Sequence, residues 1–188
     1  MKKILSQAAG LAAIATLGAC ASTPAPMPTA KPGFMQDGLP DAVKVPAGHR
    51  VAMETVGVGE ITYECKTKAN AADQHEWVFV GPKAALNDRS GKTVGSYFGP
   101  PATWVSLDGS KLTATQLAVA PAGAGNIPLQ LVKANPAMGE GAMTGVTHIQ
   151  RVATQGGVAP TLPCASGNLG QKQVVAYQAD YIFWKAAM

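Results

Sequence analysis

Hydrophobic residues recur at every second position through much of this chain. They form short runs, and residues typical of turns lie between the runs. Ile61, Tyr63 and Cys65 alternate with polar residues, so their side chains share one face of a predicted strand. The run Trp-Val-Phe-Val at 77–80 is apolar throughout, which indicates a buried strand that Gly81-Pro82 should end. A period of two, rather than a helical period, therefore predicts the elements of the domain.

The pair Asp108-Gly109 gives the strongest hairpin signal, because it suits a tight turn between two apolar runs. Helical spacing is convincing only near the N-terminus, although Lys83–Leu86 has the composition of one helical turn. Further strands are predicted at 104–107, 111–113 with a continuation at 117–120, 127–133, 144–152 and 174–184. So many short strands predict an all-β fold, a single antiparallel β-sandwich or barrel-like domain.

The N-terminus carries a targeting signal. Two lysines precede an apolar run that is typical of a secretory signal and too short to span a membrane. Leu17–Cys20 resembles the lipobox of bacterial lipoproteins, in which the cysteine is lipidated and begins the mature chain. We therefore expect a lipoprotein signal peptide at 1–19 and lipidation at Cys20, with an ordinary secretory signal as the alternative. Ala21 then indicates an outer membrane lipoprotein, facing the periplasm or exposed at the surface.

A proline-rich segment follows the lipobox. Residues 21–46 contain six prolines and few large apolar side chains, which predicts an extended tether. The expected organisation is a lipidated cysteine with its linker at 20–45 and a β domain at 46–188. A packed arm is the alternative near Val43 and Val45 only.

Composition limits the partners. Without the signal peptide the chain has 13 basic and 11 acidic residues, and its lysines and arginines form no stripe. Nucleic acid is therefore not an expected partner. The membrane is one, through the lipid anchor; no cofactor is expected, and no protein or small-molecule partner can be named.

Two cysteines remain once Cys20 is assigned to lipid. Cys65 and Cys164 form an even pair in an oxidising compartment, which favours a disulfide. A redox pair or a metal site is less favoured, because neither cysteine lies in a C-x-x-C motif and no histidine is near either. The segment 145–164 would then connect distant parts of the domain covalently.

The stretches of the chain together resemble DUF3455, a bacterial and fungal family of unknown function. The longest match runs from Val146 to Val152 and continues through Gly156–Pro160 to Cys164. The others are 45–48, 63–65, 77–79, 99–100, 104, 108–110, 177 and 181. The family pattern often has a histidine before its Gly-Pro-Trp segment, where this chain has 96–98 (Ser-Tyr-Phe). The resemblance implies a secreted β-rich domain and no particular activity.

Candidate chemistry gathers around five residues: Trp104, Asp108, His148, Gln150 and Arg151. His148 and Gln150 share one strand face and Arg151 points to the other. As a ligand pocket they would recognise a polar or anionic group. The favoured alternative is structural, an Arg151–Asp108 pair and a core tryptophan.

Other catalytic and metal motifs are weak. The chain lacks the G-x-S-x-G motif of serine hydrolases. Asp73–Glu76 offers carboxylates and one imidazole, but adjacent strand residues point to opposite faces, so a polar loop is favoured over a metal site. The sequence therefore favours a lipid-anchored, non-catalytic binding or structural domain of the cell envelope. The alternative is a small periplasmic enzyme with His148 as general base and Asp108 or Arg151 assisting.

Overall fold

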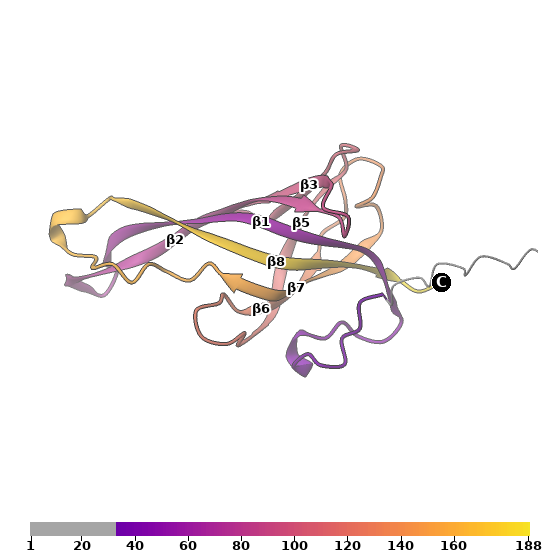
Figure 1. Ribbon diagram of the computed structural model, residues 1–188, viewed down its shortest axis with the longest axis horizontal. Coiled ribbons are helices and arrows are strands. Elements are labelled where there is room, and N and C mark those ends of the chain that lie inside the picture. Colours follow the sequence, from indigo (N-terminus) through magenta and orange to yellow (C-terminus); the bar gives the residue numbers. More distant parts are fainter. Residues whose placement is uncertain (1–32) are drawn as a thin grey trace, which may run out of the picture. The chain divides into compact units, whose positions relative to one another are not determined.

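The computed structural model describes residues 33–188, which form an eight-stranded antiparallel closed barrel with strands in chain order (Figure 1). Its strands are β1 (His49–Lys68), β2 (Ala71–Asn87), β3 (Thr93–Phe98), β4 (Thr103–Ser106), β5 (Lys111–Ala120), β6 (Leu129–Ala134), β7 (Val146–Gly156) and β8 (Lys172–Ala186). The all-β prediction is confirmed, and of the two predicted architectures the fold is the barrel, not the sandwich. The signal peptide and Cys20 lie outside the described residues.

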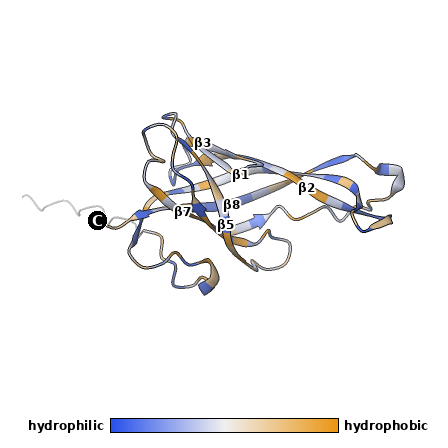
Figure 2. Cartoon of the chain, turned by 180° about the vertical axis from the view of Figure 1, so that it is seen from behind, coloured by the Kyte–Doolittle hydropathy of each residue, from blue (hydrophilic) through white to orange (hydrophobic). Residues whose placement is uncertain are grey.

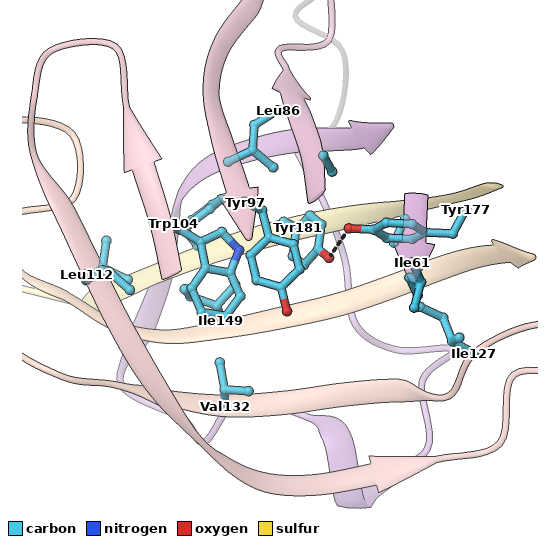
Figure 3. Packing of buried hydrophobic residues seen from close by; sticks show 14 of the residues in the cluster. Ile61, Leu86, Tyr97, Trp104, Leu112, Ile127, Val132, Ile149, Tyr177 and Tyr181 are labelled. Atoms are coloured by element: carbon cyan, nitrogen blue, oxygen red, sulfur yellow. Dashed lines mark hydrogen bonds between the residues drawn. The ribbon is translucent and has the colours of Figure 1, made fainter. Parts of the chain in front are cut away.

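The alternating pattern places one face of each strand inside the barrel. Figure 2 shows hydrophobic and hydrophilic residues interleaved along the strands. The inner cluster comprises Ile61, Tyr63, Ala84, Leu86, Tyr97, Trp104, Leu112, Ile127, Val132, Met143, Val146, Ile149, Tyr177, Ala179, Tyr181 and Phe183. Figure 3 shows aromatic side chains meeting at its centre, where Tyr97 stacks on Trp104 with ring centroids 4.6 Å apart. The barrel interior is thus a packed core.

Three strands continue beyond the barrel as an extension. β3 pairs with β2 only from Lys83 to Asn87, whereas β1 pairs with both β2 and β8 far past that point. Cys65 of β1 lies in this extension and bonds to Cys164, with their Cα atoms 5.5 Å apart. The predicted disulfide is confirmed.

Strand β2 departs most from expectation. It runs through Gly81 and Pro82 without ending, and it includes Asp73–Glu76 and Lys83–Leu86, so neither the polar loop nor the helical turn forms. Pro82 pairs with Ile61 of β1 and lies one residue outside the β2–β3 pairing, so no residue of β3 needs its missing N–H. Gly81 is required because a Cβ there would collide with the Gly99 carbonyl.

An N-terminal arm, residues 33–45, packs on the outer wall of the barrel and includes the 3₁₀ helix η1 (Asp41–Val43). The outer cluster lies beneath it: Val43, Val45, Ala120, Leu129, Leu131, Val152, Ile182 and Trp184. The residues 33–45 of the predicted tether are therefore part of the packed body, and Val43 and Val45 lie in it without forming an edge strand. A second 3₁₀ helix, η2 (Ser166–Asn168), follows Cys164.

Within residues 33–188, no helix has the length and apolar character needed to cross a membrane.

Candidate functional site

The five predicted site residues occupy different places. Trp104 on β4 is buried in the inner cluster, between Tyr97 and Tyr181. Its indole Nε1 has no hydrogen-bond partner among the described residues. Trp104 is a core residue, as the structural alternative predicted.

Asp108 fixes a turn. Its Oδ1 accepts hydrogen bonds from the backbone N and the hydroxyl of Ser110, at 2.9 and 2.6 Å, and its Oδ2 accepts one from the backbone N of Ala142 at 2.7 Å. These bonds hold the pKa of the Asp108 carboxyl well below its usual range. The carboxylate ties the β4–β5 turn to the loop before β7 and makes no ion pair with Arg151.

Gln150 faces outward from β7 and is completely buried under the N-terminal arm. Its Nε2 donates to the Val43 carbonyl at 2.6 Å and to Gln36 Oε1 at 3.0 Å. Its Oε1 accepts the indole N–H of Trp184 at 2.9 Å. Every polar atom of this amide is used to hold the arm, so none remains for a ligand.

His148 lies against His49, the first residue of β1, with ring centroids 4.7 Å apart. Burial, His49 and Lys133 lower the pKa of His148, which favours the neutral imidazole. Its Nδ1 contacts the hydroxyl of Thr147 at 3.1 Å. The enzyme hypothesis required His148, Asp108 and Arg151 to meet in one cleft, and the structure does not bring them together.

Arg151, the fifth residue, lines a cavity of about 360 Å³ at the barrel mouth, where the extension begins. Its guanidinium points inward because Arg151 shares the face of Ile149, an inner-cluster residue two positions away. The polar lining also includes Tyr97, Gln116 and Gln130. The apolar lining comes from Phe79, Pro82, Pro100, Ala102, Ala114 and Val132. The mouth therefore combines one cation with apolar walls.

The Arg151 guanidinium is anchored but has no acidic partner. Its Nε and Nη2 donate to the Pro128 carbonyl at 3.2 and 2.9 Å. Among residues 33–188, no carboxylate lies within 4.0 Å of it. Burial raises the pKa of the four tyrosines of the inner cluster, to about 12 for Tyr177, and the charge of Arg151 opposes that rise. The positive charge of Arg151 therefore affects the pKa of the phenols in the inner cluster as well as the electrostatics of the cavity.

Sequence reasoning missed the other residues of the mouth. Gln130 Nε2 donates to Gln116 Oε1 at 2.6 Å, across the β5–β6 pair. Phe79 is half exposed at the rim, and Pro100 belongs to the β3–β4 loop. Alternation with Leu129 and Leu131 could not have found Gln130, because it predicts the leucines inside; Gln130 points inward since both leucines belong to the outer cluster.

A larger groove, about 900 Å³, lies on the outside of β1–β4. Val58, Phe98 and Leu107 expose apolar surface there. Its charged lining residues are one acid and one base, Glu60 and Lys83. Among the described residues no cluster of three metal-ligating side chains occurs. The mouth cavity is the stronger candidate because it holds an unpaired charge.

Comparison with known proteins gives one result. The family described as "Protein of unknown function (DUF3455)" matches residues 46–185. Neither a curated protein nor a solved structure matches the chain.

Proposed function

The chain belongs to the DUF3455 family, and we propose that it is a lipid-anchored, non-catalytic binding protein of the cell envelope. In this proposal Cys20 carries the lipid at the outer membrane, and the mouth cavity holds a small-molecule ligand. The observation that carries the binding role is the Arg151 guanidinium, half-buried beside apolar walls and without an acidic partner in the part of the chain that the structure describes. A cation in such a place is stabilised when a ligand supplies the opposite charge.

The lining of the cavity supports binding over catalysis. Among the described residues that line it there is no histidine, carboxylate, cysteine, serine or lysine. Burial raises the pKa of Tyr97, so its phenol is a poor base at neutral pH. A bound molecule would thus be held without a nucleophile or general base beside it.

The sequence supports the anchor. The signal and lipobox precede a segment, residues 21–32, that could span about 40 Å if fully extended. The arm then fixes the start of the packed body to the barrel wall through Gln36, Gln150 and Trp184. The mouth would therefore lie within reach of molecules near the membrane surface.

The anchor is tested by metabolic labelling with an alkyne fatty acid in a bacterial host that processes lipoproteins. We expect label and membrane fractionation for the wild type, and loss of both for Cys20→Ser. Cys65→Ser/Cys164→Ser, which leaves Cys20 intact, serves as the control and keeps its label. If Cys20→Ser fractionates like the wild type, the chain has an ordinary secretory signal.

The binding role is tested by thermal shift with the mature chain in detergent, against a library of small acids, amines and neutral compounds. Compounds that bind the mouth should raise the melting temperature of the wild type and not that of Arg151→Gln. Lys133→Gln removes the same charge from the neighbouring strand, where Lys133 is exposed and alternates with the inner residue Val132. It should respond like the wild type. A library without any stabilising compound would contradict the proposal.

A further inference from the structure

The proposed binding function leaves the ligand class open, and the geometry of the mouth narrows it. We infer that the cavity binds a small monocarboxylate carried on a flat apolar body, such as an aromatic acid. This inference rests on the proposed function and adds to it the chemistry of the ligand.

The first argument is the free edge of the Arg151 guanidinium. A guanidinium has five N–H donors in a fixed plane, and Nε and Nη2 each direct one toward the Pro128 carbonyl. The opposite edge, formed by Nη1 and the second N–H of Nη2, has no acceptor among the described residues. Two parallel N–H groups on one edge match the two oxygens of a carboxylate.

The second argument is the amount of charge. Arg151 is the only charged residue among the described residues that line the cavity. One guanidinium neutralises one negative charge, so a phosphate monoester or a dicarboxylate would keep an unpaired charge in a partly apolar site. A monocarboxylate matches the site, since its single charge and both oxygens are satisfied by one arginine.

The third argument is the shape of the lining. A volume of about 360 Å³ lies near the lower end of the size range of ligand pockets, which limits the ligand to a small molecule. Phe79, Pro100 and Val132 provide apolar walls in the same cavity as the cation. Aromatic and proline rings pack best on flat apolar groups, so acetate alone would leave these walls uncovered.

The glutamine pair adds a polar contact at the rim. Because Gln130 Nε2 donates to Gln116 Oε1, the Gln116 amide nitrogen and the Gln130 amide oxygen stay available. They offer one donor group and one acceptor to a substituent on the ligand. A hydroxyl on the aromatic ring can use both at once, so hydroxylated acids should bind more tightly than the parent acid.

The experiment is isothermal titration of the mature chain in detergent with five probes: benzoate, 4-hydroxybenzoate, benzamide, acetate and phenyl phosphate. We expect benzoate and 4-hydroxybenzoate to bind, with the second tighter. Benzamide lacks the charge, acetate lacks the apolar body, and phenyl phosphate carries a charge that one arginine cannot match, so these three should bind at least about tenfold more weakly.

Variants assign the binding to the mouth. Arg151→Gln should weaken benzoate by about tenfold or more, and Arg151→Lys should also weaken it because a lysine loses the two-point contact. Gln130→Ala should remove the preference for 4-hydroxybenzoate without abolishing benzoate binding. Lys133→Gln is the charge-matched control and should bind all probes like the wild type.

The outcomes separate the two levels of the proposal. If benzamide or phenyl phosphate binds as tightly as benzoate, the inferred ligand class is wrong. The ligand class is also wrong if neither aromatic acid binds while other library compounds stabilise the protein through Arg151. If no compound of the wider library depends on Arg151, both the ligand class and the proposed binding function fail.

Discussion

The two hydrophobic clusters of this protein are built by different means. The inner cluster lies inside the barrel and most of its residues are on the strands, so sheet pairing determines most of their neighbours, while Ile127 and Met143 come from loops. The outer cluster lies on the opposite face of β5–β8 and is closed by an arm from a proline-rich segment. Both clusters share the same strands, because Tyr181 and Phe183 point inward while Ile182 and Trp184 point outward.

Their polar groups differ in the same way. In the inner cluster the indole N–H of Trp104 is buried and has no partner within residues 33–188, and aromatic contacts surround it. In the outer cluster the indole N–H of Trp184 donates to Gln150, whose amide in turn holds Gln36 and Val43. Strand pairing fixes most of the inner residues, and a few phenol hydrogen bonds, such as that from Tyr63 to the Gly157 carbonyl, add to it. Residues 33–45 form no strand, so apolar packing and side-chain hydrogen bonds together fix the position of the arm.

The largest effect should come from the disulfide, which lies outside both clusters. Cys65→Ser/Cys164→Ser opens a covalent loop with a sequence separation of 99, and we expect a loss of about 4–5 kcal/mol of unfolding free energy. Because the bond acts mainly on the unfolded chain, the loss should affect both clusters together. Urea unfolding followed by tryptophan fluorescence and by circular dichroism measures it. Equal melting of samples verified as oxidised and as reduced would remove the disulfide from this account.

Gln150→Ala should break the outer cluster specifically. It leaves the Trp184 N–H and the Val43 carbonyl buried without partners, which we expect to cost about 3 kcal/mol. Limited proteolysis should then cleave the arm before the barrel, because the strands keep their pairing. Gln155→Ala, at an exposed position of the same strand, is the matched control. It should change neither the unfolding free energy nor the rate of cleavage in the arm by much. An arm that stays resistant in Gln150→Ala would mean that apolar contacts alone hold it.

Much of the barrel could be predicted from the sequence because alternation is a local property. The Asp108-Gly109 hairpin and the strand that ends near Trp184 required only neighbouring residues. Strand β2 could not be predicted through Gly81-Pro82, because the tolerance of Pro82 depends on where β3 stops pairing. The closing of the outer cluster could not be predicted either, since it depends on a contact between Gln36 and Gln150, 114 positions apart.

The candidate site shows the same limit. The sequence placed Arg151 on the strand face opposite His148 and Gln150, and the structure has this arrangement. A closed barrel separates the two faces of a strand into an inside and an outside, and His148 and Gln150 do not line the cavity that Arg151 lines. The residues that do accompany Arg151 come from β2, β3, the β3–β4 loop, β5 and β6. Their approach follows from barrel closure, which no short motif encodes.

The smallest expected effect comes from making the same substitution, tryptophan to phenylalanine, once in each cluster and comparing the two losses of stability. Trp104→Phe and Trp184→Phe each remove the indole N–H and part of the ring from a buried site. At Trp104 the lost packing is partly offset, because an N–H without a partner is removed with it. At Trp184 the substitution leaves Gln150 Oε1 without its donor, so the loss should be larger by about 1–3 kcal/mol. Chemical unfolding of the two variants measures this difference. Equal losses would mean that the hydrogen bond from Trp184 to Gln150 adds nothing measurable, and that apolar packing holds the arm.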